Sequence, residues 1–146
     1  MSTTPGGDPF DLERFVVAQD THGSYDTALA ELRRGRKTSH WMWYVFPQVA
    51  GLGHSPMARR YAVSGLAEAR AYLAHPVLGD RLRVCAQVVA DSDAASAEQL
   101  LGGIDAVKLR SSVTLFAAAA PDEAVFTRVL ERYFGGVPDE ATTSRL

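Results

Sequence analysis

The chain has 146 residues, of which 47% are hydrophobic and 22% are charged, with one cysteine and a formal net charge of -2. This length and composition exclude a disordered chain and a disulfide-built scaffold, and they predict a soluble globular protein with its own core. The slightly negative charge argues against a nucleic-acid partner. No apolar run approaches the roughly 20 residues that span a bilayer, and the N-terminus lacks a signal-peptide pattern, so we expect no membrane partner and a cytoplasmic location.

A small, polar segment opens the chain. Residues 1–7 include a proline and two glycines, and they predict a flexible N-terminal tail before a single helical domain over residues 8–146. Asp8 followed by a proline is typical of a helix start, and apolar residues then recur at helical spacing. Ser24 is predicted to cap the next helix, which Gly35 ends because glycine accepts the left-handed conformation that closes helices.

The rest of the chain repeats this pattern of helix starts and stops. Later helix starts are predicted at Ser55, Ser64, Pro76, Ser96, Asp105 and Pro121. Apolar residues at helical spacing follow each start, and the alternation typical of strands is not found. Residues 41–46 are apolar and aromatic, and a short helix or turn is favoured there over a strand. We therefore predict an all-α fold, with six or seven helices in one compact orthogonal or irregular bundle.

The densest chemistry lies in residues 35–56, which hold both tryptophans and two of the four histidines. A cationic pair precedes the aromatic run, and a Gly-x-Gly loop leads into a helix start, where exposed amides bind phosphate or carboxylate well. A tryptophan could stack on a planar base, and Gln48 could read its hydrogen-bonding edges. The predicted ligand-binding residues are Arg36, Lys37, Ser39, His40, Trp41, Gln48, Gly51, Gly53, Ser55, Lys108 and Ser111.

Simpler interpretations of the same residues remain open. The aromatic run is more simply part of the core, and the basic residues at the end of the second helix offset the negative end of its dipole. Lys108 is spaced to share a helix face with Ser112, which would allow a Ser-Lys nucleophile. The favoured alternative is that Asp105 caps the helix and the serines bond preceding carbonyls.

Metal and redox chemistry find little support in the sequence. The four histidines lack the spacing typical of zinc sites, so no metal and no cofactor are predicted. Cys85 lies among apolar residues and is expected to be buried and inert. His40 is the histidine that we would test as an acid or base, because it lies beside cations and aromatics.

Several of these motifs occur together in a known family. They are the run from Asp8 to Leu12, Gly35 to Lys37, Ser39 to Trp43, Phe46 to Gln48, and the segment from His75 to Gly79. The chain resembles the bacterial family called domain of unknown function 1810, and its mycobacterial members most closely. The resemblance covers residues 8–140. It implies a single, mostly α-helical domain and implies no activity.

Two functions follow as expectations. The first is binding of a small anionic ligand, phosphorylated or nucleotide-like. The alternative is a non-catalytic protein-interaction or regulatory module with partly exposed tryptophans and an unidentified protein partner. Whether the protein is an enzyme is left open at this point.

Overall fold

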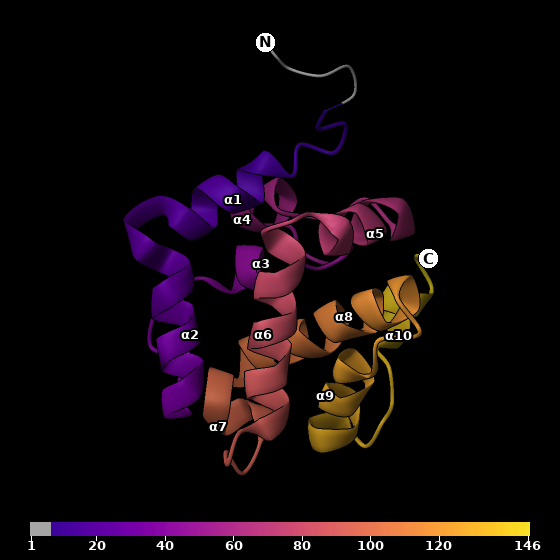
Figure 1. Cartoon of the computed structure of the whole chain (residues 1–146). Helices are drawn as coiled ribbons and strands as arrows, with labels where there is room; N and C mark the ends of the chain where they lie inside the picture. Colours follow the sequence, from indigo (N-terminus) through magenta and orange to yellow (C-terminus); the bar gives the residue numbers. More distant parts are fainter. Residues whose placement is uncertain (1–6) are drawn as a thin grey trace.

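Helix α8 (Gly103–Ala119) lies at the centre of the fold in the computed structural model, which describes residues 7–146. Its residues 111–116 are all buried, because α8 contacts α5, α7, α9 and α10 on different sides. Helix α6 runs between α2 and α9, and α1 crosses the far end of α2 (Figure 1). The other helices are α1 (Glu13–Asp20), α2 (Ser24–Arg34), α3 (Met42–Val45), α4 (Pro56–Arg60), α5 (Leu66–Ala74), α6 (Leu78–Asp91), α7 (Ala97–Leu101), α9 (Ala124–Phe134) and α10 (Glu140–Thr143).

The predicted all-α class is confirmed. Several helices begin or end at the residues that the sequence indicated. Gly35 ends α2 with φ of 87°, a left-handed conformation that costs glycine little. The Ser55 hydroxyl accepts a hydrogen bond from the amide of Ala58 at 3.1 Å, and Ser96 caps α7 through Gln99 in the same way at 3.0 Å. Side-chain caps visible in the sequence therefore do begin α4 and α7.

Other boundaries differ from the prediction. The expected six or seven helices are too few, because one-turn helices such as α3 and α10 show no usable periodicity. Asp8 does cap, accepting from the amides of Leu12 and Glu13 at 2.7 and 2.9 Å, but α1 begins only at Glu13. Asp105 lies inside the first turn of α8 and not at its cap, because its carboxylate is drawn into ion pairs described below.

One β-type contact interrupts the helices. Val49 and Val63 form an isolated parallel bridge, in which the Val63 amide donates to the Gln48 carbonyl at 2.8 Å and the Ala50 amide donates to the Val63 carbonyl at 2.8 Å. No strand is present between residues 7 and 146. The bridge closes the loop that contains the Gly-x-Gly turn. None of the helices in this part of the chain is long and apolar enough to cross a membrane.

Aromatic rings form the centre of the core. Tyr72 contacts Phe15 and Phe116 with ring centroids 5.1 and 5.3 Å apart, and Phe126 continues the series from Phe116 at 5.9 Å. Trp41 is only 1% exposed, which agrees with the simpler interpretation of the aromatic run as core. The predicted flexible tail, residues 1–7, falls outside the described residues except for the exposed Gly7, and it stays a prediction.

Candidate functional site

The segment after α2 wraps around the carboxylate of Glu31. Glu31 is 3% exposed, and its Oε1 accepts from the amides of Thr38 and Ser39 at 2.8 and 3.0 Å and from Trp41 Nε1 at 2.9 Å. Its Oε2 accepts from the Ser39 hydroxyl at 2.5 Å. Ser39 and Trp41, two of the predicted ligand-binding residues, therefore bind an anion of the protein itself.

These hydrogen bonds decide the charge state of Glu31. Burial by itself would raise the pKa, but the bonds from Ser39, Thr38 and Trp41 outweigh it and lower the pKa to about 2. A carboxylate with so low a pKa is a weak base, so Glu31 does not activate the Ser39 hydroxyl as a nucleophile. Ser39 and Trp41 act in the scaffold that fixes the turn after α2.

The two predicted lysines meet at one aspartate. Asp105 Oδ2 lies 2.8 Å from Lys37 Nζ, and Asp105 Oδ1 lies 3.7 Å from Lys108 Nζ. Each ammonium also sits over an indole, with Lys37 5.2 Å from the Trp41 ring centre and Lys108 5.1 Å from that of Trp43. The Lys37 amide donates to a carbonyl of α7 at 2.8 Å. This cluster ties the start of α8 to the segment after α2.

Ser111 belongs to a different network. Its buried hydroxyl donates to Asp139 Oδ2 at 2.9 Å, and the same oxygen accepts from the Thr142 hydroxyl at 2.5 Å. Asp139 caps α10, so the network attaches the C-terminal turn to α8. Lys108 and Ser112 make no such contact: Lys108 is paired with Asp105, and Ser112 has no hydrogen-bond partner among the described residues. A Ser-Lys nucleophile is not formed.

The loop from Gly51 to Ser55 forms a turn and caps a short helix. Gly51 has φ of 98° and lies against the side chain of Arg145, and Ser55 caps the five-residue helix α4. So short a helix has little macrodipole to attract an anion. Gln48 is half-buried and takes part in the bridge through its backbone carbonyl.

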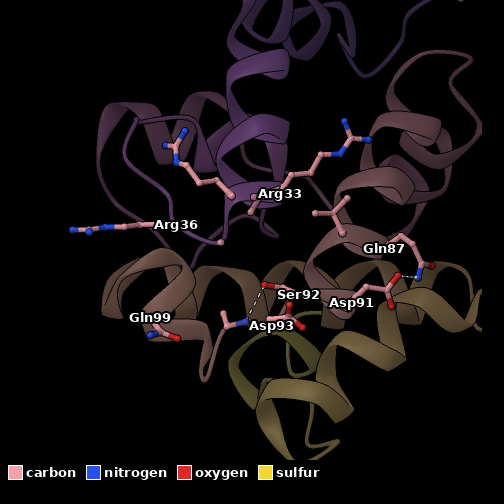
Figure 2. Close-up of a pocket in the computed structure, with 12 residues that line it drawn as sticks. Arg33, Arg36, Gln87, Asp91, Ser92, Asp93 and Gln99 are labelled. Atoms are coloured by element: carbon pink, nitrogen blue, oxygen red, sulfur yellow. Dashed lines mark hydrogen bonds between the residues drawn. The ribbon is translucent and has the colours of Figure 1, made fainter.

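Arg36 lies at an open hollow between the ends of two helices. We call it the α2–α6 hollow; its volume is about 750 Å³, and Figure 2 shows its lining. The lining residues are Leu32, Arg33, Arg34, Gly35, Arg36, Gln87, Val88, Asp91, Ser92, Asp93, Ala94 and Gln99. The Arg33 and Arg36 side chains extend from the end of α2 in different directions, so their guanidinium groups stand at the rim (Figure 2). Neither guanidinium has a hydrogen bond or ion pair within residues 7–146.

His40 opens to a different hollow, of about 420 Å³, at the start of α2. Its lining includes His22, Ser24, Tyr44 and Tyr61, and the Ser24 hydroxyl lies 2.6 Å from that of Tyr44. Arg36 and His40, only four positions apart, therefore serve separate hollows, and Ser111 lies in neither lining. Ser39, His40 and Trp41 share the lining of this second hollow, but the predicted residues as a set do not converge on one cavity.

The comparisons with known proteins place the chain. The family described as "Protein of unknown function (DUF1810)" matches residues 9–146. The chain belongs to the DUF1810 family. The DUF1810 chain is also similar to the conserved hypothetical protein Rv1873 from Mycobacterium tuberculosis, whose crystal structure shares 49% sequence identity with a TM-score of 0.92. The match covers 95% of this chain and 98% of Rv1873. Curated proteins show no match. The family resemblance is thus confirmed, and it brings no reaction with it.

Sequence reasoning missed the residues opposite the arginines. In the sequence, Asp91 and Asp93 are two polar residues that follow an apolar stretch, and Gln87 has no distinguishing signal. Arg33 was noted, but as a residue that offsets the helix dipole. These charged groups lie near one another because α2 contacts α6. The sequence does not show that contact, so it gives no reason to pair them.

Proposed function

We propose that the α2–α6 hollow binds a small anionic ligand. The observation that carries the proposal is the gathering of Arg33, Arg34 and Arg36 along one side of a hollow of about 750 Å³, with two of the three guanidinium groups unpaired among the described residues. A guanidinium presents several fixed donors that match phosphate and carboxylate oxygens. The volume lies in the range of roughly 300–1,000 Å³ that small-molecule sites occupy.

The lining favours the phosphorylated form of the expected ligand over the nucleotide-like one. Among residues 7–146, no aromatic side chain lines the α2–α6 hollow, and the indole of Trp41 is enclosed in the core with its N–H bonded to Glu31. A base would therefore find no stacking surface at this place. A compact, polar molecule with a phosphate suits the arginine rim better. Binding, and not catalysis, is the function proposed; a cytoplasmic location stays a prediction.

Replacing the unpaired arginines tests the proposal. Inorganic phosphate and a hexose phosphate at high concentration are expected to raise the melting temperature of the wild type, since a ligand that binds the folded state stabilises it. The double change Arg33→Gln and Arg36→Gln is expected to weaken binding by at least about tenfold, because charge-assisted bonds are lost. The melting temperature without ligand should stay nearly constant.

Arg59→Gln is the matched control, because Arg59 is also an exposed arginine and lies on α4, outside the lining of the hollow. Its variant should keep the full ligand effect. The proposal is wrong if no phosphate compound raises the melting temperature, or if the double variant responds as strongly as the control.

An exposed apolar surface on α8 supports the alternative function, a non-catalytic interaction module. Ile104 and Val107 are 77% and 63% exposed and are neighbours on one face of α8, whereas Trp41 is buried and Trp43 half-buried. In its testable form the partner is a second copy of the chain. Sedimentation velocity should then show self-association that Ile104→Lys removes. A wild-type chain that sediments as a monomer at high concentration would exclude this form of the alternative.

A further inference from the structure

The hollow that His40 borders differs in kind from the α2–α6 hollow. It has a volume of about 420 Å³ and lies where α1 meets the start of α2, and we call it the α1–α2 hollow (Figure 1). Its lining residues lie in the ranges 17–27 and 39–44 and at Tyr61. The left-handed backbone of His22 and Gly23, with φ of 54° and 65°, turns the chain sharply between the two helices. Side chains of both helices therefore border one concave place.

The lining of the α1–α2 hollow lacks formal charge. Among residues 7–146 it includes no aspartate, glutamate, lysine or arginine, and its polar groups are hydroxyls and the imidazoles of His22 and His40. A carboxylate or phosphate that entered would give up its water without gaining a charged partner of opposite sign, which costs free energy. The lining therefore favours an uncharged ligand.

The apolar part of the lining suits a single ring. The rings of Tyr44 and Tyr61 meet edge to face with centroids 5.4 Å apart, and Val17, which is 55% exposed, and Ala18 add aliphatic surface from α1. Aromatic side chains form favourable edge-to-face and offset contacts with another ring. The volume lies near the lower end of the range of roughly 300–1,000 Å³ for small-molecule sites, so a one-ring compound fits it best.

Two polar groups of the lining lie close together and are incompletely bonded. Ser24 Oγ lies 2.6 Å from Tyr44 Oη. This bond uses one of the two hydroxyl protons, so the other remains to be donated. The His40 carbonyl oxygen lies 3.5 Å from Tyr44 Oη, which is too long for a good O–H···O bond, and it accepts no shorter bond within the described part of the chain. A donor and an acceptor thus lie side by side.

We propose that the α1–α2 hollow binds an uncharged aromatic carboxamide. The carboxamide carbonyl accepts from the hydroxyl pair of Ser24 and Tyr44, its N–H donates to the His40 carbonyl, and the ring lies against Tyr61 and Val17. One carboxamide presents an acceptor and a donor next to each other, which matches the 3.5 Å separation of the two protein groups. Site and ligand are separate from those of the proposed function, and neither proposal rests on the other.

Benzamide and benzoate test the proposal, because they are nearly equal in shape and differ in charge. Each is titrated into isotopically labelled protein at pH 8, above the range in which imidazoles ordinarily titrate, and backbone amides are followed by NMR. Benzamide is expected to shift the signals of Thr27 and His40. At these signals it should bind at least about fivefold more tightly than benzoate, because the carboxylate finds no charged partner and has no N–H to donate.

The double change Ser24→Ala and Tyr44→Phe removes both hydroxyls and keeps the ring. It is expected to weaken benzamide binding by about threefold to tenfold, the contribution of one net hydrogen bond. Ser144→Ala combined with Tyr133→Phe is the matched control, because both residues lie outside the lining, and it should bind benzamide like the wild type. Melting temperatures verify that both double variants are folded.

Thr27→Lys provides a test that leaves the hydroxyl pair in place. Thr27 is an exposed lining residue, so its replacement should not disturb the fold, and a cation there should lower or reverse the preference for benzamide over benzoate. An unchanged preference would show that the compounds bind elsewhere and would overturn the proposal.

The remaining outcomes are equally decisive. The proposal is wrong if benzamide leaves Thr27 and His40 unshifted, if benzoate binds there as tightly, or if the folded double variant binds benzamide like its control. Benzoate that shifts Gly35 and Ser92 would report on the α2–α6 hollow, whose lining includes both residues. The same titrations therefore distinguish failure of this proposal from failure of the anion site.

Discussion

The change Glu31→Gln is expected to lower the melting temperature by about 10 °C at pH 7. The folded-state pKa of Glu31 is about 2 against an ordinary value of 4.5, a difference that corresponds to about 3 kcal/mol of stability in the ionised state. For a domain of this size, each kcal/mol shifts the melting temperature by about 3 °C. The amide replaces the carboxylate poorly: its carbonyl can keep the N–H donors of Thr38, Ser39 and Trp41, but they lose an ionised acceptor, and its NH₂ group removes the acceptor of the Ser39 hydroxyl.

The same change has a predicted pH dependence. Because the folded-state pKa is lowered, the stabilisation by Glu31 is fully present above pH 4.5 and is lost as the pH falls through about 2. The gap between the melting temperatures of the wild type and the variant should therefore shrink steadily below pH 4.5. Glu131→Gln, on the exposed face of α9, is the control and should show no gap. Equal melting temperatures for Glu31→Gln and the wild type at pH 7 would contradict the role given to Glu31.

The change Gly79→Ala is expected to destabilise the protein by about 3 kcal/mol, the upper end of the cost of overpacking. A methyl group on Gly79 would collide with the carbonyl oxygen of Leu73 and lie 2.9 Å from its carbonyl carbon. Backbone cannot move aside as a flexible side chain can, and the same carbonyl accepts from Arg83 Nη2 at 3.1 Å. The close approach of α5 to the start of α6 thus requires glycine. Thermal unfolding should show a loss of about 10 °C.

Gly103→Ala is the matched control for that change. Gly103 is the first residue of α8, a methyl group there would meet no atom within 4 Å, and its φ lies outside the left-handed region. Alanine should therefore stabilise the protein by up to about 1 kcal/mol, because it restricts the unfolded chain more than glycine does. Equal destabilisation of both alanine variants would contradict this prediction. It would indicate a general intolerance to glycine replacement, and the collision at Gly79 would not be the cause.

Local signals predicted the helices well where one residue caps its own helix. Ser55, Ser96 and Gly35 each act within four positions of the chain, so sequence order alone places donor beside acceptor. Asp105 shows where this reasoning fails. It has the residue type of a cap, but Lys37, far away in the sequence, provides a stronger partner at 2.8 Å. A tertiary ion pair thus overrode a local preference.

The sequence indicated some of the residues around the candidate site, but it did not indicate how they are arranged. The Ser39 hydroxyl and the Trp41 indole do bind an anion, yet that anion is Glu31, which in the sequence is one more polar residue of a helix. Arg36, which was predicted as a ligand-binding residue, lines an open hollow. Asp93 was not predicted, because nothing in a linear sequence indicates that residues near position 35 and position 93 border the same space.

The sequence by itself determined the helical class, the single domain and the aromatic core, because periodicity, caps and burial of large apolar side chains depend on residues close in the chain or on residue type alone. Only the tertiary structure decided which polar groups are satisfied internally and which remain open to a ligand. Lys37 and Ser39 have partners on other helices, and Lys108 is paired with Asp105 within α8, whereas Arg33, Arg36 and Asp93 have no ion pair among the described residues. The physical reason is that a charge takes the best partner within a few ångströms, and the fold alone decides which groups come that near.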